Sequence, residues 1–427
     1  MSGAIILAVA ALLLLTGLGL AYVVGAAAVL SFFLTDHGRY LAILPQKVFS
    51  QISVFALLSM PLFILAGELM NRGGVTKALI DFSMSIVGRI RGGLGHVNIM
   101  SSVFFAGISG SAVADAASLS NTLVPAMERQ GYTRLYASAI TAASSIIGPI
   151  VPPSIILIFY GAIMQTSVAA LFLAGVLPGL LLALALMLLN AWFAWRDSHP
   201  RIEPSEIPPL ASAFVQALPA LMLPLIIVGG IVLGWMTPTE AAAIAVIAAM
   251  FAAMFYQGLK WADVKQSLQR TAMLTGSIFV VLSAVAVFGH LASLERLPQE
   301  ISEMVTQWDL SPLAFMLALN ALLLLIGMFM DIPLALALMV PLLAPVAISQ
   351  GADPVHLGIV ICMNLTLGLT SPPVGGCLLI VSTVTGVNYW QLARAILPFF
   401  MVHIVVLVIL VLVPDISLAL PRAMGLV

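Results

Sequence analysis

Hydroxyl, amide and glycine residues gather at three places where an otherwise apolar chain is interrupted. The first reads Gly-Ile-Ser-Gly-Ser-Ala-Val-Ala-Asp over residues 107–115, and the others span residues 144–153 and 364–373. A helix broken inside a membrane leaves free N–H groups at one new end and free carbonyl groups at the other. The N–H groups attract anions and the carbonyl groups attract cations. The interruptions therefore predict sites for an anion and for a small cation such as sodium.

The predicted sodium ligands supply hydroxyl, amide, carboxylate or carbonyl oxygens, which suit a hard ion. They are Ser109, Ser144, Ser145, Gly148, Gly327, Asp331, Asn364, Thr366, Gly368 and Thr370. The predicted substrate-binding residues lie at the first interruption and where new half-helices would begin. They are Ser109, Gly110, Ser111, Pro152, Pro153, Thr370, Ser371, Pro372 and Pro373. Hydrogen bonds to neighbouring helical turns are the structural alternative for each Ser and Thr.

At the third interruption, Thr370 or Ser371 is expected to cap a half-helix that begins with Pro372 and Pro373. Two acids near mid-membrane, Asp115 and Asp331, are functional candidates because a carboxylate is costly there. Asp331 precedes Ile-Pro and is equally well placed as a helix N-cap, whereas Asp115 has no partner that the sequence identifies.

Two other acids are predicted to be structural. Glu68 has Arg72 four residues later as a helical partner near the cytoplasmic interface. Glu240 follows Thr237-Pro-Thr, which predicts a capping box at a helix start.

The elements that position these residues are duplicated in the chain. Residues 107–153 align without gaps with residues 327–373, at an offset of 220, and six of the nine identical positions are Gly or Pro. Gly and Pro determine the path of the backbone, so a duplicated path is expected. In a membrane protein this pattern indicates two equivalent broken elements around one site.

The composition places these elements in a membrane. The chain of 427 residues is 62% hydrophobic and 8% charged, against about 25% charged in soluble domains. Its repeated apolar runs predict roughly ten or more helical crossings rather than a barrel. The first 34 residues carry no basic leader and are expected to form membrane helices. Cys362 and Cys377 lack metal-binding spacing, and the net charge of −1 gives no indication of nucleic-acid binding.

The expected organisation is an all-α polytopic fold with two inverted repeats, residues 1–195 and 210–427, joined by a hydrophilic cytoplasmic linker at 196–209. Each repeat would contain a re-entrant helical hairpin, at about 94–127 and 312–349, and a broken helix, at about 135–163 and 355–385. Basic residues dominate 72–93 and a predicted loop at 258–270, which indicates the cytoplasmic side, and acids dominate a loop at 295–309. Symmetry favours two short helices, rather than one, within residues 3–34.

The sequence argues against several other functions. It contains no His-Glu-x-x-His, Walker loop or nucleophile elbow, so neither an enzyme nor an ATP-driven pump is expected. A channel-like protein or exporter on the same repeats is the alternative from another class. A channel needs a continuous polar lining, whereas these crossings are polar only at the interruptions.

Four motifs together resemble the large membrane subunit of the tripartite ATP-independent periplasmic (TRAP) transporters. They are Gly-Ile-Ser-Gly-Ser-Ala-Val-Ala-Asp-Ala from residue 107, Pro-Ile-Val-Pro-Pro-Ser-Ile from 149, Gly-Met-Phe-Met-Asp from 327 and Leu-Thr-Ser-Pro-Pro-Val-Gly from 369. The resemblance covers nearly the whole chain and implies a sodium-driven secondary transporter of the bacterial inner membrane. It also implies an elevator motion, a small four-helix membrane subunit, and a periplasmic binding protein that delivers an organic acid, with no cofactor beyond sodium and no transition metal.

The first hairpin bears on the substrate. It reads Ser-Gly-Ser-Ala-Val-Ala-Asp, whereas the sialic-acid members of the family that this chain resembles have a Ser-Pro-Ala-Thr run at this place. The resemblance therefore favours a C4-dicarboxylate or a sugar acid, with sialic acid as the alternative.

Overall fold

A computed structural model describes residues 9, 11–13, 15, 17–35, 37–256, 258–308 and 310–427. Within these residues the chain is built from helices, with no strand. The first half contains α2 (Leu20–Leu34), η1 (Gly38–Ile43), α3 (Leu44–Ile52), η2 (Phe55–Leu58), α4 (Ser59–Arg72), α5 (Val75–Val87), α6 (Gly93–Ser109), α7 (Ala112–Arg129), α8 (Arg134–Ser144), η3 (Ser145–Ile147), α9 (Ile155–Met164) and α10 (Val168–Arg196). The predicted helix preceding α2 falls largely outside the described residues.

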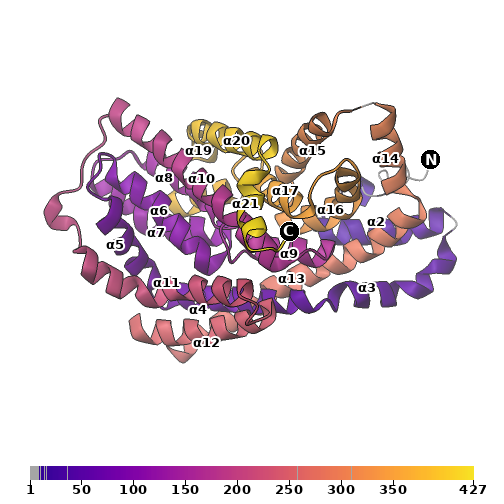
Figure 1. Cartoon of the computed structure of the whole chain (residues 1–427), viewed down its shortest axis with the longest axis horizontal. Helices are drawn as coiled ribbons and strands as arrows, with labels where there is room; N and C mark the ends of the chain where they lie inside the picture. Colours follow the sequence, from indigo (N-terminus) through magenta and orange to yellow (C-terminus); the bar gives the residue numbers. More distant parts are fainter. Residues whose placement is uncertain are drawn as a thin grey trace.

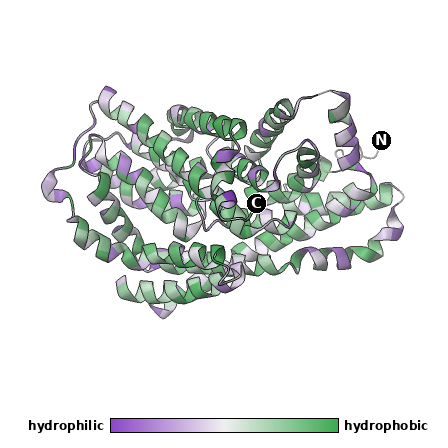
Figure 2. Ribbon diagram, in the orientation of Figure 1, coloured by the Kyte–Doolittle hydropathy of each residue, from purple (hydrophilic) through white to green (hydrophobic). Residues whose placement is uncertain are grey.

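After a short η4 (Pro204–Glu206), the second half contains α11 (Leu210–Val232), α12 (Pro238–Tyr256), α13 (Trp261–Leu294), α14 (Leu297–Gln307), α15 (Pro312–Gly327), α16 (Ile332–Ser349), α17 (Pro354–Gly368), α18 (Gly376–Thr385), α19 (Tyr389–Ala395), α20 (Leu397–Leu412) and α21 (Asp415–Ala423). The segment between α10 and α11 is visibly hydrophilic beside the largely apolar helices (Figure 2). It coincides with the predicted linker.

Several corresponding helices of the two halves have bounds that lie 220 residues apart, the offset of the sequence repeat. Helix α7 spans 112–129 and α16 spans 332–349, while α8 and α17 begin at 134 and 354. Gly131 and Gly351 follow these hairpins with almost the same left-handed φ, 92° and 93°. Both Pro–Pro pairs, at 152–153 and 372–373, are joined by cis peptide bonds. The orientation of each half relative to a membrane remains a prediction.

Fewer helices have the full length of a membrane span than the sequence suggested. Among the described residues, six helices are long and apolar enough to cross, or seven if the bent pair α19 and α20 is one span. Five further apolar helices have only 10–17 residues. These include α17 and α18, the two halves of the second broken helix, because Gly and Pro divide its apolar run.

Two predicted loops are helical. The predicted loop at 258–270 is wrong because α13 begins at Trp261, so Arg270 lies within a helix. The predicted loop at 295–309 contains α14, whose first turn carries Glu300. Charged residues suggested solvent-exposed loops, but they also occur on the polar faces and first turns of helices.

Helices α2, α3, α4, α12 and α13 pack together on one side of the molecule (Figure 1). Helix α4 packs on α12 and α13, and α13 also packs on α2 and α3. These helices run along one long edge, with the hairpins and broken helices above them (Figure 1). The broken helices are tied together where the Tyr160 hydroxyl of α9 donates to the Pro354 carbonyl at the start of α17, at 2.8 Å. This hydrogen bond joins the broken helix of the first repeat to that of the second.

Several helix starts are capped as the sequence predicts or as symmetry would suggest. Glu240 and Thr237 form a reciprocal pair at α12: the Glu240 carboxylate accepts from the Thr237 amide at 2.8 Å, and Thr237 Oγ1 accepts from the Glu240 amide at 3.3 Å. Thr133 caps α8 by accepting from the Tyr136 amide at 3.2 Å. At the equivalent position, Asp353 caps α17.

Replacing Asp353 by alanine is expected to cost about 1–2 kcal/mol of unfolding free energy. Its Oδ1 accepts from two amides of α17, those of Val355 at 2.8 Å and His356 at 3.1 Å. Thr133→Ala removes one such bond and should cost less, about 0.5–1 kcal/mol. Denaturant or thermal unfolding of the purified variants measures both values. An Asp353→Asn variant, which retains a capping oxygen, is the control; if it is as unstable as Asp353→Ala, the capping explanation is wrong.

Candidate functional site

A cavity of about 370 Å³ lies between the hairpins and the helices α4 and α13. The tip of the first hairpin, the start of α16, and one face each of α4 and α13 form its walls. Its polar lining consists of Glu68, Asn71, Ser109, Ser111, Asp115, Ser118, Arg270, Ser277 and Asp331. Four of the predicted site residues therefore reach it: Ser109, Gly110, Ser111 and Asp331.

The first hairpin turns at Gly110, which has a left-handed φ of 57°. A Cβ at this position would lie 2.9 Å from the carbonyl oxygen of Pro153, so glycine also permits a close approach to the first interruption. Ser111 then caps α7 by accepting from the Ala114 amide at 3.4 Å. Because Ala112 and Ala114 line the cavity, the N-terminal end of α7 faces it and favours negative charge there.

Asp115 is fully buried, in the first turn of α7. Its Oδ1 accepts a hydrogen bond from Ser109 Oγ across the turn, and its Oδ2 has no hydrogen-bond partner among the described residues. Gly148 of the first interruption lies opposite, and a Cβ there would clash with Oδ2. Within the described residues no Lys or Arg forms an ion pair with Asp115.

Asp331 occupies the N-cap position of α16, but its side chain makes no capping hydrogen bond. It is exposed and faces the cavity. The Asp331 side chain therefore makes none of the capping hydrogen bonds considered for it, and it lies on the cavity wall.

The hydroxyls of the first interruption are engaged with the protein. Ser144 Oγ donates to Asn98 Oδ1 at 2.9 Å and accepts from Ser102 Oγ at 2.9 Å. Ser145 Oγ donates to the Ala142 carbonyl one turn earlier, at 2.9 Å. Sequence reasoning missed Asn98 and Ser102; the signal was a group of polar residues, which also includes His96 and Ser101, in a largely apolar helix. Neither Ser144 nor Ser145 lines the cavity, and the same holds for Gly148, Pro152 and Pro153.

The second interruption is similarly buried. Asn364 Nδ2 donates to Asn320 Oδ1 at 2.7 Å, and Thr366 Oγ1 donates to the Cys362 carbonyl at 2.6 Å. Thr370 and Ser371 donate to the carbonyls of Leu367 and Gly368, at 3.0 and 2.8 Å. The cavity is not lined by any of the predicted residues of this region, namely Gly327, Asn364, Thr366, Gly368, Thr370, Ser371, Pro372 and Pro373.

The predicted cap at this interruption is wrong. Helix α18 begins at Gly376, with Gly375 at its N-cap in a left-handed conformation, three residues beyond Pro373. Ser371 Oγ is bonded instead to the end of the preceding helix. At the first interruption, the half-helix α9 likewise begins after the Pro–Pro pair, and Ser154 caps it through the Leu157 amide at 3.3 Å. In both repeats the Pro–Pro pair lies in the connecting turn.

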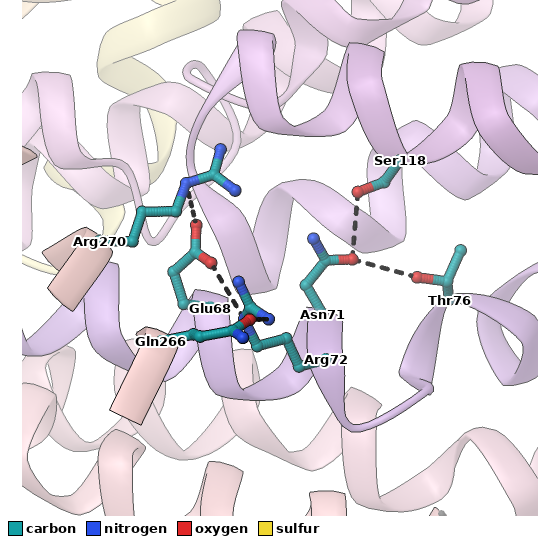
Figure 3. A network of polar contacts seen from close by, with 7 residues as sticks. All are labelled: Glu68, Asn71, Arg72, Thr76, Ser118, Gln266 and Arg270. Atoms are coloured by element: carbon teal, nitrogen blue, oxygen red, sulfur yellow. Dashed lines mark hydrogen bonds and ion pairs between the residues drawn. The ribbon is translucent and has the colours of Figure 1, made fainter. Parts of the chain in front are cut away.

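One basic residue reaches the cavity, and sequence reasoning had placed it in a loop. Arg270, from α13, has its Nε 3.0 Å from Glu68 Oε1 of α4. The predicted helical pair of Glu68 with Arg72 is present at 3.8 Å (Figure 3). Within the described residues, no three His, Cys, Asp or Glu side chains gather where they could hold a metal ion.

The sequence matches one family model over residues 7–416, described as the DctM component of the tripartite ATP-independent periplasmic transporters. It is 37% identical to the sialic acid TRAP transporter large permease protein SiaM of Vibrio cholerae, over 92% of each chain. It is also 37% identical to the C4-dicarboxylate large permease protein DctM of Pseudomonas aeruginosa, again over 92% of each chain. The 2,3-diketo-L-gulonate large permease protein YiaN of Escherichia coli is 34% identical, over 87% of this chain and 88% of its own.

Among solved structures, the fold is similar to the YdaH transporter of Alcanivorax borkumensis. The TM-score is 0.67 at 12% identity, over 89% of both chains. It is also similar to MtrF of Neisseria gonorrhoeae, with a TM-score of 0.62 at 13% identity, over 88% of this chain and 83% of that one. At these identities the likeness shows the fold alone. The family match over residues 7–416 and the relatives at 37% identity show that the chain belongs to the DctM family, the large permease subunits of TRAP transporters. These subunits are inner-membrane proteins and not enzymes.

Proposed function

We propose that this chain is a sodium-coupled carrier of an organic acid, and that the cavity at the tip of the first hairpin is its substrate site. The observation that supports this most is the composition of that cavity: helix N-termini and hydroxyls of the hairpins on one wall, and α4 and α13 on the other. The substrate would be delivered by a periplasmic binding protein, and a small four-helix membrane subunit would complete the transporter.

Sodium is proposed as the coupling ion because buried oxygens surround the interruptions. Among the described residues, Asp115 offers an oxygen without a hydrogen-bond partner, and Asn364 Oδ1 is also buried without one. Such oxygens are costly to bury unless an ion or a water molecule binds them. The hydroxyls of Ser144, Ser145, Thr366 and Thr370 donate to protein acceptors and still have lone pairs to offer. These four residues therefore stay in the proposed ligand set.

The substrate is proposed to be a C4-dicarboxylate or a sugar acid, with sialic acid as the alternative. The sialic acid and C4-dicarboxylate relatives are equally similar, at 37% identity, so overall identity favours neither. The hairpin sequence from Ser109 to Asp115 is the feature that favours the first two classes.

Transport is proposed to follow an elevator motion, in which the hairpins and broken helices move as one body along α4 and α13. One side-chain contact that would break during such a motion is visible in Figure 3. Ser118 Oγ of hairpin helix α7 donates to Asn71 Oδ1 of α4 at 3.1 Å. A covalent cross-link between α4 and the hairpin helix α7 should therefore stop the transport cycle.

A cross-linking experiment tests this motion. Cysteines replace Asn71 and Ser118 in a variant whose buried native cysteines, Cys362 and Cys377, are alanine. A short reducible thiol cross-linker should lower uptake at least tenfold, and reduction should restore it.

The control joins two residues of the stationary body. Arg72 Nη1 of α4 donates to Gln266 Oε1 of α13 at 2.6 Å, so cysteines at these two positions lie on two helices that contact each other, and a longer cross-linker of the same chemistry joins them. Cross-linking this pair should leave at least half of the uptake. Full uptake after complete cross-linking of the Asn71–Ser118 pair would contradict the elevator motion.

A further inference from the structure

We infer that Arg270 is the cationic contact for the carboxylate of the substrate, and that Glu68 occupies Arg270 when the site is empty. This inference rests on the proposed function, since it assigns a substrate contact within the same cavity. The sequence had suggested that helix N-termini and bound cations alone would hold the anion, because no Lys or Arg lies in the interrupted elements. Arg270 comes from outside those elements, on α13.

The guanidinium of Arg270 is only partly engaged by the protein. Its Nε is 3.0 Å from Glu68 Oε1, and the two terminal nitrogens point away from that carboxylate (Figure 3). The side chain is half exposed, whereas that of Glu68 is largely buried. The terminal nitrogens thus remain available to bind a carboxylate, for which a planar guanidinium has matching geometry.

The charges around Glu68 leave an excess of positive charge. Glu68 lies between two arginines, Arg270 at 3.0 Å and Arg72 at 3.8 Å, so the three side chains together carry one uncompensated positive charge. Arg72 does not line the cavity, and its Nη1 is held by Gln266. The positive charge that faces the cavity is therefore that of Arg270.

The arrangement of α13 directs this charge toward the first hairpin. Arg270, Leu274 and Ser277 line the cavity at spacings of four and three residues, so they share one face of the helix. The opposite wall contains the N-terminal end of α7, with Ser111 at its cap. A substrate carboxylate between the two would meet the Arg270 guanidinium on one side and a helix N-terminus on the other, in a cavity whose lining also holds the carboxyl groups of Asp115 and Asp331.

Binding of the substrate at Arg270 exchanges one carboxylate partner, that of Glu68, for another, that of the substrate. A substrate carboxylate that binds Arg270 competes with Glu68, and Glu68 keeps Arg72 as its partner when it is displaced. The buried Glu68 carboxylate is therefore not left uncompensated, and its return to Arg270 assists release of the substrate. A neutral substrate could not make this exchange.

The test compares variants of Arg270 with a matched variant of Arg72 in the reconstituted transporter. Arg270→Gln should raise the KM for the transported acid at least tenfold, with the sodium half-saturation unchanged. Arg270→Lys, which keeps the charge but loses the planar fork, should raise it less. Arg72→Gln leaves Glu68 with Arg270 as its one arginine partner, which makes the exchange less favourable, so it should also raise the KM. This increase should be smaller than that for Arg270→Gln, because the Arg270 contact with the substrate remains. Equal increases for Arg270→Gln and Arg72→Gln, or an unchanged KM for Arg270→Gln, would overturn the inference.

A binding measurement separates this inference from the proposed function. In the purified chain, the transported acid should raise the unfolding temperature of the wild type and of Arg72→Gln, but not that of Arg270→Gln. Wild-type uptake that ignores sodium would contradict the coupling mechanism, whereas this stabilisation would still support Arg270 as the anion contact. An acid that stabilises Arg270→Gln as much as the wild type would contradict the Arg270 contact, whatever the uptake.

Discussion

Replacing Gly368 by alanine is expected to abolish transport and to lower the unfolding temperature of the protein. Gly368 ends α17 at the second interruption, where it meets Gly327 at the end of α15. A Cβ on Gly368 would lie 2.7 Å from the Cα of Gly327, and its nearest neighbours are all backbone atoms. Because backbone cannot rotate away, the two helices must separate, at a cost at or above the usual 1–3 kcal/mol for overpacking.

The control is an alanine at a glycine in open surroundings. Gly276 lies within α13 and has no left-handed φ, and a methyl group added to it would meet no neighbouring element of the described chain within 4 Å. Gly276→Ala should therefore leave uptake unchanged and leave stability unchanged or slightly raised. Uptake and thermal unfolding are measured for both variants. Wild-type uptake by Gly368→Ala would show that the close contact of α15 and α17 is not required.

Replacing Asp115 by asparagine is expected to reduce sodium-driven uptake at least tenfold and to raise the sodium concentration for half-maximal uptake. Asparagine has nearly the same volume and can still accept from Ser109, so the fold should persist. What is lost is the negative charge, which in this buried site has no basic partner among the described residues. A sodium ion bound there would lose its strongest electrostatic partner.

Glu240→Gln serves as the control for a carboxylate-to-amide change. Glu240 is an exposed residue in the capping box of α12, and its replacement should leave the sodium dependence unchanged. Initial uptake rates over a range of sodium concentrations distinguish the two variants. A normal sodium dependence in Asp115→Asn would assign Asp115 to the structure of the hairpin instead.

The bounds of several helices follow the spacing of Gly and Pro in the sequence, for a physical reason. Gly and Pro restrict the backbone locally, so their repeated spacing carries over directly to helix bounds, as in α7 and α16. The same holds for the capping box of Thr237 and Glu240 and for the Glu68–Arg72 pair, which depend on residues three or four positions apart.

Contacts between distant segments could not be predicted in this way. Arg270 meets Glu68 only because α13 packs on α4, and Asn364 meets Asn320 only because α15 packs on α17. The start of a half-helix was also misplaced at Ser371 and Pro372, since a Pro–Pro pair can equally lie in the turn before the helix. A single sequence shows which polar residues are costly in the membrane, but not which partner each one finds.

Uptake of a radiolabelled organic-acid panel into proteoliposomes tests the central claim most directly. The liposomes contain this chain with its small membrane subunit, and they are assayed with and without the periplasmic binding protein and an inward sodium gradient. Uptake of one acid that requires both the binding protein and the gradient is the predicted result. Uptake that proceeds without the sodium gradient would contradict the coupling mechanism, and the oxygens at the interruptions would then be structural.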